Sequence, residues 1–127
     1  MGVDKISLTV ISPEKILYTG EANSLKIPGI DGYFGVLPNH ASMISELDIG
    51  IMEVNSSDQK IQMVIEGGFV EVKTNLVSVL TGGGDLRERI DLHKAKSDLE
   101  KWEKAPMSPE RSLALKKAKT RIAIHEN

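Results

Sequence analysis

Histidine is the side chain best suited to acid–base chemistry near neutral pH, and this chain has three, His40, His93 and His125. They are far apart in the sequence, and none belongs to a nucleophile motif or a dense metal-ligand spacing. The chain has no cysteine, which excludes thiolate catalysis and a disulfide framework. A small enzyme that uses His40 is one hypothesis. A loop histidine that bonds to backbone or to a neighbouring protein is the favoured interpretation.

His40 ends a distinctive segment at residues 32–40. Two glycines bracket two aromatic side chains there, and a proline follows two aliphatic residues. Glycine permits positive φ, whereas proline fixes φ and removes a hydrogen-bond donor. We therefore predict a shaped loop between strands, used for docking rather than for catalysis.

Gly82, Gly83 and Gly84 form a second glycine-rich candidate, because they follow a predicted strand and precede a predicted helix. This position would suit a phosphate-binding loop. The run lacks the Gly-Lys-Ser/Thr ending and the glycine spacing of that motif. We interpret the three glycines as a hinge between two parts of the chain.

The composition changes sharply near residue 84. Every glycine and every valine lies in residues 1–84, which is typical of strands and turns, whereas most alanines lie in residues 85–127. The first part has 5 lysines, no arginine and 10 acidic residues, a net charge of −5; the second has 11 basic and 8 acidic residues, a net charge of +3. We predict two domains, a strand-rich one at 1–84 and a helical one at 85–127.

Short alternating or apolar runs, separated by turn residues, recur through the strand-rich part. They occupy residues 6–10, 25–27, 49–54, 61–65, 69–72 and 76–80. Gly67 and Gly68 are expected to separate two of these strands. Regularly spaced short strands favour an antiparallel β-sandwich or barrel.

The second part predicts two helices, because its apolar positions recur at spacings of 3 and 4 residues. The repeating positions are Leu92, Ala95, Leu99 and Trp102, and then Leu115, Ala118, Ile122 and His125. Ser108 suits an N-cap with Pro109 at the first helical position. The short connection between the helices predicts an antiparallel hairpin.

This hairpin has few apolar residues to bury, so we expect it to lean on the strand-rich domain or on a partner. Leu113 and Ile124 point away from the predicted seam between the helices. They are either stray apolar residues at fraying ends or a second contact surface used in another state.

The composition also limits the kinds of partner that we expect for this protein. A net charge of −2 argues against a nucleic-acid-binding protein, and the basic hairpin surface is either solvated or attracted to an acidic partner. No apolar run approaches the length of a membrane span. We expect no nucleic acid, no direct membrane insertion, no metal and no resident cofactor.

Six stretches of the chain, in this order, carry a resemblance to a known family. They are Val10-Ile11-Ser12-Pro13, residues 32–40, Asp48-Ile49-Gly50, residues 67–72, Ile90-Asp91 and residues 113–121. Together they resemble the epsilon subunit family of the F-type ATP synthase, in its bacterial form. The resemblance implies a β-sandwich followed by a C-terminal two-helix antiparallel hairpin.

The resemblance also implies a non-catalytic rotor subunit of the central stalk. Such a subunit binds the gamma subunit and the ring of c subunits, and it couples ion- or proton-driven ring rotation to ATP synthesis in the F1 head. The hairpin is implied to regulate: folded on the sandwich it permits activity, and extended to the alpha/beta head it inhibits ATP hydrolysis. The implied location is peripheral, on the cytoplasmic face of a bacterial inner membrane.

The same resemblance implies roles for particular residues. The implied partner-docking residues are Tyr33, Phe34, Leu37 and His40, and the implied regulatory-helix residues are Leu113, Lys117, Arg121 and Ile124. Tyr33 stands where relatives are often acidic, so aromatic packing replaces charge in the expected contact with the ring.

Some relatives bind ATP between the folded helices through an Ile/Leu-Asp-x-x-Arg-Ala motif. The corresponding stretch here runs from Ile90 to Ala95 and has lysine in place of the arginine, which keeps the charge but loses the planar, two-pronged geometry. Asp91, Lys94 and Arg121 are the candidate ATP contacts. An ATP-binding sensor is therefore the alternative function.

Overall fold

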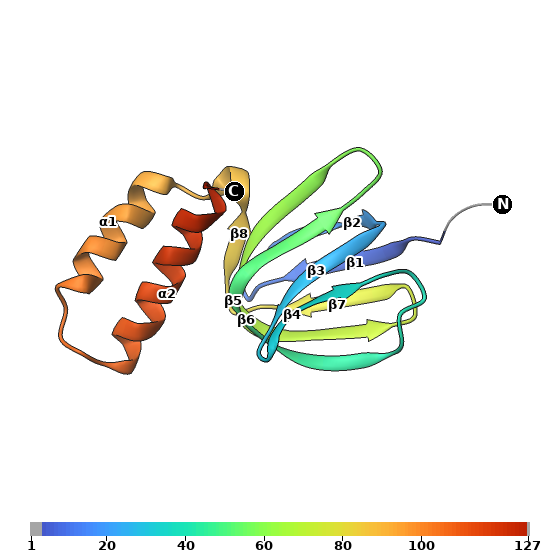
Figure 1. Cartoon of the computed structure of the whole chain (residues 1–127), viewed down its shortest axis with the longest axis horizontal. Helices are drawn as coiled ribbons and strands as arrows, with labels where there is room; N and C mark the ends of the chain where they lie inside the picture. Colours follow the sequence, from blue (N-terminus) through green and yellow to red (C-terminus); the bar gives the residue numbers. More distant parts are fainter. Residues whose placement is uncertain (1–3, 127) are drawn as a thin grey trace.

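The protein, in a computed structural model that describes residues 4–126, consists of a β-sandwich followed by two antiparallel helices (Figure 1). The strands are β1 (Ile6–Ile11), β2 (Ile16–Ala22), β3 (Ser24–Gly29), β4 (Gly32–Val36), β5 (Met43–Asn55), β6 (Lys60–Lys73), β7 (Leu76–Leu80) and β8 (Gly84–Leu86). A short 3-10 turn η1 (Arg87–Arg89) leads to α1 (Leu92–Glu103) and α2 (Pro109–Ile124). The predicted fold class is confirmed.

The strands pair in the order β2-β1-β7-β6-β5-β3-β4, with β8 added to β6. All pairs are antiparallel except β1 and β7, so the expectation of a wholly antiparallel sandwich is wrong at that pair. Alternation along a strand does not reveal the direction of its neighbour. A parallel pair needs a long crossover, which the chain between β1 and β7 supplies.

Alternate side chains of the strands meet in one apolar core. Val10, Ile27, Met63 and Val79 are each 0% exposed. Burying a side chain of this size contributes roughly 1.5–3 kcal/mol, so the core is the main source of stability of the sandwich. It provides the rigid base on which surface residues are positioned.

Two glycine-rich stretches differ from their predictions. Residues 32–36 are not a loop but strand β4, because they pair in register with β3. Gly67 and Gly68 do not separate two strands but bend the single long strand β6. Gly68 has a φ of +110°, and a Cβ atom there would lie 1.9 Å from the carbonyl oxygen of Leu80. Only glycine fits that conformation and that close approach.

The bend changes which residues of β6 face the core. Met63 and Ile65 are buried before the bend, and Val70 and Val72 after it. The inward positions therefore switch from odd to even numbers across the glycines. As a result, the outward residues before and after the bend belong to two different outer surfaces of the sandwich.

Both helices begin at polar caps. The Asp91 carboxylate accepts from the backbone N–H of Lys94, and the Ser108 hydroxyl oxygen accepts from the N–H of Arg111, so the predicted Ser108 cap is confirmed. Figure 1 shows α2 next to the sandwich and α1 on its outer side. α2 contacts β5 and β6, and α1 packs on α2.

The predicted hinge glycines are hydrogen-bonded to the sandwich. The carbonyl oxygen of Gly83 accepts from the backbone N–H of Glu66 and from the Thr81 hydroxyl, and Gly84 begins β8. Strand pairing thus continues to Leu86, beyond the predicted boundary at residue 84. A hinge role for Gly82–Gly84 stays a prediction.

Candidate functional site

The apolar part of the contact between hairpin and sandwich is a small cluster around Ile124. Its side chain is 0% exposed and packs with Val64 of β6 and Ile90, with Ile51 at the edge. Arg87 Nε donates to the Ile124 carbonyl oxygen at 3.0 Å, and His125 Nε2 donates to the Ile90 carbonyl oxygen at 2.7 Å. The C-terminal turn of α2 is therefore the part of the hairpin that is anchored most firmly.

This arrangement rules out one interpretation of Ile124. In the docked hairpin it is not a frayed residue, because its side chain is buried while Leu113 is 54% exposed. The helical wheel placed both off the seam between the helices, but only Ile124 belongs to the apolar cluster with Val64 of β6. A contact surface of Leu113 and Ile124 in another state stays a prediction.

Two carboxylates on adjacent strands hold the basic face of α2. Lys116 Nζ lies 2.7 and 2.8 Å from the two oxygens of Asp48, which stands on β5. Glu66 of β6 pairs with Arg121 at 2.5 Å and with Lys117 at 3.9 Å. The positive surface of α2 is thus partly neutralised by the acidic sandwich, in keeping with the opposite net charges of the two parts.

These ion pairs affect the acidity of the carboxylates. The hydrogen bond from Lys116 holds the pKa of Asp48 below its ordinary value, together with the backbone N–H of Ile49. Burial alone would raise the pKa of Asp85, but Lys15 at 2.9 Å and the N–H of Leu86 lower it overall. Both groups are therefore more stable as carboxylates in the folded protein.

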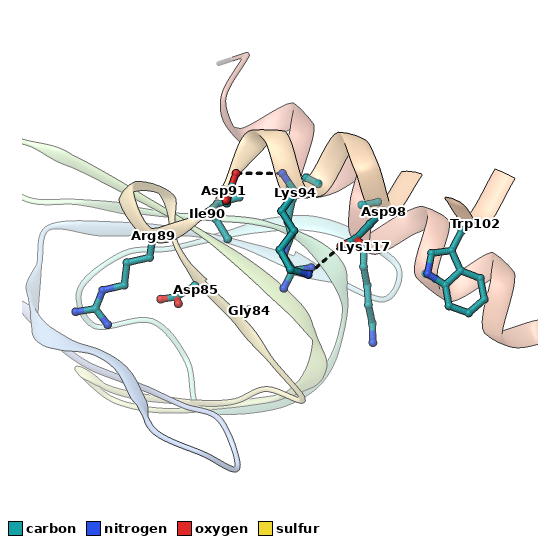
Figure 2. Close-up of a pocket in the computed structure, with 13 residues that line it drawn as sticks. Gly84, Asp85, Arg89, Ile90, Asp91, Lys94, Asp98, Trp102 and Lys117 are labelled. Carbon is teal, nitrogen blue, oxygen red and sulfur yellow. Dashed lines mark hydrogen bonds and ion pairs between the residues drawn. The ribbon is translucent and has the colours of Figure 1, made fainter. Parts of the chain in front are cut away.

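A cavity of about 400 Å³ lies between the hairpin and β8 (Figure 2). The candidate ATP contacts Asp91, Lys94 and Arg121 all line it, so the fold brings them together. Each of them already has a partner within the chain. Asp91 caps α1, Lys94 pairs with Asp98 at 3.3 Å, and Arg121 pairs with Glu66.

The four predicted docking residues do not form one surface. Tyr33 lines a groove of about 570 Å³ between β5 and α2; its hydroxyl oxygen accepts from the N–H of Ile51, and Lys26 lies over its ring. Phe34, the next residue of β4, packs against the core. Adjacent residues of a strand point to opposite faces, which the loop prediction could not take into account.

Leu37 and His40 lie together in the turn after β4. Leu37 is 64% exposed, and its carbonyl oxygen accepts from the backbone N–H of His40. The His40 ring bonds the carbonyl oxygen of Ala41 at 2.7 Å. This is the backbone contact that the favoured interpretation of His40 describes.

A row of exposed apolar side chains crosses the sheet and was missed at the sequence level. Ile16, Ile11, Leu80 and Phe69 are successive cross-strand partners on β2, β1, β7 and β6, and they are 61%, 38%, 57% and 55% exposed. We call these four residues the apolar row. These residues could have been recognised in the sequence, because apolar side chains occupy outward-facing strand positions where the alternating pattern of a half-buried sheet has polar residues.

Within residues 4–126, no group of three or more His, Cys, Asp or Glu side chains is placed to hold a metal ion. The same range contains no helix long and apolar enough to cross a membrane. The surfaces that stand out are the apolar row and the two carboxylates that hold the hairpin. The fold and these surfaces define a β-sandwich docking module with a helical hairpin held against it.

Comparison with known proteins identifies the family to which this β-sandwich module belongs. Residues 5–83 match the family described as "ATP synthase, Delta/Epsilon chain, beta-sandwich domain". The ATP synthase epsilon chain of Leptospira interrogans is 48% identical, with 98% of each chain covered. That of Prochlorococcus marinus strain MIT 9301 is 33% identical over 96% of this chain and 98% of the relative. The chain belongs to the ATP synthase epsilon chain family.

Solved structures agree with this assignment. A chain in the Euglena gracilis mitochondrial ATP synthase, in a structure of OSCP, F1 and c-ring, is 26% identical with a TM-score of 0.82, and the match covers 97% of this chain and 82% of that one. A chain in the Tetrahymena thermophila central stalk and c-ring shares the fold at 14% identity and a TM-score of 0.63, with 97% and 95% covered. As a family member, this chain is a subunit of an enzyme complex and not itself catalytic.

Proposed function

We propose that this chain is a rotor subunit of the central stalk of an F-type ATP synthase. In this role it binds a gamma subunit and the ring of c subunits, and it helps to couple ion-driven rotation to ATP synthesis. The observation that carries the proposal is the match over 97% of this chain with a chain of an F1 and c-ring assembly. The bacterial relatives support a peripheral location on the cytoplasmic face of a bacterial inner membrane.

The apolar row is the surface that we assign to gamma. Four large apolar side chains in register across four strands form a contiguous exposed patch, and such patches mark protein interfaces. The turn with Leu37 and His40 is the surface that we assign to the ring. Tyr33 lines a groove beside α2, and we therefore assign it to the folded hairpin rather than to the ring.

The hairpin is the regulatory element in this proposal. The small apolar cluster around Ile124, three lysine or arginine side chains of α2, and the hydrogen bonds of Arg87 and His125 join it to the sandwich. An element with so few buried contacts detaches at low free-energy cost. Released, it is free to reach the alpha/beta head and inhibit ATP hydrolysis, with Leu113, Lys117, Arg121 and Ile124 available for contact there.

Co-purification with a gamma subunit from the same source tests the proposal. The wild-type chain is expected to co-elute with gamma on gel filtration. Leu80→Glu places a charge in the centre of the apolar row and should weaken binding at least about tenfold, since a buried unpaired charge is costly. Leu113→Glu, a similarly exposed leucine on α2, is the control. Failure of the wild type to bind gamma would count against the proposal.

A second candidate, an ATP-binding sensor, is favoured by one observation. Asp91, Lys94 and Arg121 line a single cavity between hairpin and sandwich, as ATP capture would require. Isothermal titration of the purified chain with ATP tests this candidate. Binding that is lost in Lys94→Ala would support it, whereas no heat at millimolar ATP would eliminate it.

A further inference from the structure

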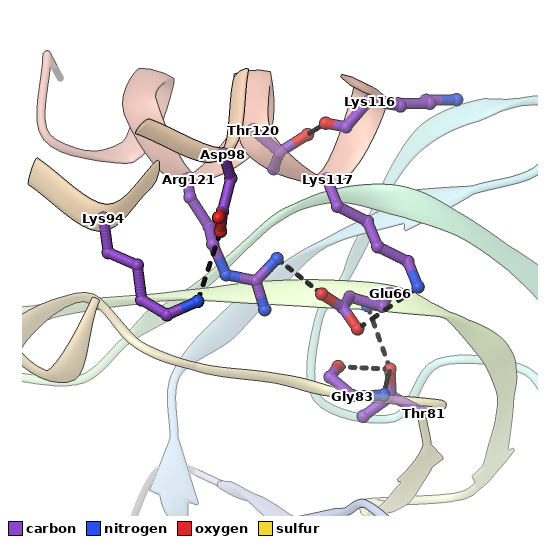
Figure 3. A network of polar contacts seen from close by, with 9 residues as sticks. All are labelled: Glu66, Thr81, Gly83, Lys94, Asp98, Lys116, Lys117, Thr120 and Arg121. Carbon is purple, nitrogen blue, oxygen red and sulfur yellow. Dashed lines mark hydrogen bonds and ion pairs between the residues drawn. The ribbon is translucent and has the colours of Figure 1, made fainter. Parts of the chain in front are cut away.

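Glu66 is the carboxylate in the sandwich that contacts two cations of α2. Figure 3 shows the Arg121 guanidinium and the Lys117 ammonium both directed at it. The Glu66 side chain is 12% exposed, compared with 26% for Arg121 and 43% for Lys117. The pair between Glu66 and Arg121 is therefore well shielded from solvent, unlike an ordinary surface ion pair.

The backbone around Glu66 is held in place by a buried hydroxyl. Thr81 is 4% exposed; its Oγ1 accepts from the backbone N–H of Glu66 at 3.0 Å and donates to the Gly83 carbonyl oxygen at 2.9 Å. Glu66 also directly precedes the glycine bend of β6. Its carboxylate is thus presented to α2 from a fixed position.

Three of the four basic side chains that line the cavity between hairpin and β8 form ion pairs inside the chain, and the fourth, Arg89, lies within electrostatic reach of Asp85. Lys94 is paired with Asp98, and Lys117 and Arg121 share Glu66. A phosphate-bearing ligand that approached Arg121 would have to displace Glu66. That carboxylate would then lie beside the phosphate without its partners, and both desolvation and like-charge repulsion oppose this.

We propose that Glu66 is a built-in anion that holds the hairpin closed on the sandwich without any bound nucleotide. The proposal rests on the regulatory role proposed above, and it adds the residue that sets the resting state. The hairpin opens when Arg121 and Lys117 exchange Glu66 for an acidic surface elsewhere. Nucleotide is then not needed to keep this chain in its closed form.

A distance measurement on the isolated full-length chain tests the proposal. The chain has no cysteine, so cysteines introduced at Thr19 on β2 and Ser97 on α1, both exposed, place two spin labels cleanly. Pulsed electron spin resonance then gives the share of molecules with the hairpin docked. Wild type should be closed with no added ligand, and ATP or pyrophosphate at millimolar concentration should leave its distance distribution unchanged.

Glu66→Gln is the decisive variant, because it keeps the shape of the side chain and removes the charge. We expect the open fraction to rise at least about tenfold, since two cations lose their shielded partner. Glu71→Gln is the matched control: the same substitution on the same strand, where the carboxylate faces Lys73 at 3.8 Å. The exchange Glu66→Arg with Arg121→Glu should restore closure, which a merely misfolded variant would not do.

Two results would overturn the proposal. One is a Glu66→Gln variant that stays as closed as wild type. The other is a wild-type hairpin that is open until ATP or pyrophosphate is added. Neither result depends on gamma, so either one would leave the proposed rotor function unaffected. Conversely, a failure of the chain to bind gamma would not change the measured closure of the hairpin.

Discussion

At the scale of single residues, the hairpin depends on a few side chains of α2 with quite different surroundings. Ile124 is fully buried against Val64 and Ile90, whereas Leu113 on the same helix is mostly exposed. Lys116 contacts Asp48 at the solvent-exposed edge of the interface, and Arg121 contacts Glu66 in its interior. Apolar burial and charge pairing therefore contribute to the docking of the hairpin at separate points along α2.

Replacing Ile124 with alanine is expected to weaken docking of α2 by about 2–5 kcal/mol, the usual cost of truncating a buried isoleucine. Hydrogen exchange of the α2 amides should speed up accordingly, while the core strands keep their protection. The control is Leu113→Ala, which should change docking by no more than about 0.5 kcal/mol because that side chain is exposed. Equal effects of the two substitutions would contradict this assignment of the anchor.

Docking should weaken in acid because of Asp48. Lys116 lowers the pKa of this carboxyl below 3.8 in the docked state. A lowered pKa contributes stability that is present above the unperturbed value and is lost as pH falls through the docked value. The docked fraction should therefore drop below about pH 4. Asp48→Asn should remove this part of the pH dependence, and an unchanged acid profile in that variant would refute the role of Asp48.

At the scale of elements, β6 determines the layout of the molecule. Before the glycine bend, its outward residues Val64 and Glu66 face α2; after the bend, Phe69 joins the apolar row. One strand thus supplies both the hairpin contact and the proposed gamma surface. The bend keeps these two surfaces apart.

Gly68→Ala should destabilise the sandwich by at least about 2 kcal/mol, because the residue has positive φ and the added Cβ would clash with the Leu80 carbonyl oxygen. Thermal unfolding measures the effect. Gly35→Ala on β4 is the matched control, since its Cβ would meet only the Leu25 carbonyl oxygen at 3.8 Å. If both variants melted at the same temperature, the bend would not need glycine.

At the scale of the whole molecule, the sandwich and the hairpin differ in how they are held together. The sandwich has a continuous core of fully buried side chains, while the hairpin has one small cluster and the ion pairs of α2. The strand β8 belongs structurally to the sandwich, because it pairs with β6. The two parts are therefore expected to unfold or detach separately.

Deleting residues 92–127 should leave a folded sandwich that retains β8 and still binds gamma. Deleting residues 85–127 also strips Asp85 and Leu86 of β8 from β6, so this shorter chain should melt at a lower temperature. In an assembled synthase, both deletions should raise ATP hydrolysis, in line with the proposed regulation. An unfolded 1–91 fragment would show that the sandwich needs the hairpin.

Local patterns were sufficient for much of the fold. The 3, 4, 3 spacing and the Ser108-Pro109 pair predicted both helices within a residue or so, since helix periodicity and capping depend on neighbours along the chain. Strand β4 was mistaken for a loop because its glycines suggested turns, while its pairing with β3 was invisible. The parallel direction of β7 relative to β1 could not be predicted from the sequence either.

In the candidate site, too, some residues could be selected from the sequence and others could not. The residues of the ATP-like motif and the basic face of α2 could be selected from the sequence, because they lie close together along the chain. Glu66 and Asp48 were not selected, since nothing near them in sequence shows which helix they meet. The apolar row is spread over four strands, and only cross-strand register unites it.

Composition, periodicity and capping residues were enough to predict the two parts of the chain, the helices and their caps, and the family that the chain resembles. That Ile124 is an anchor, that Tyr33 lies beside α2 and that Glu66 neutralises Arg121 became apparent only in the folded molecule. The difference follows from distance along the chain. Periodicity and capping are local, whereas burial and charge pairing depend on which remote residues the folded core brings within contact.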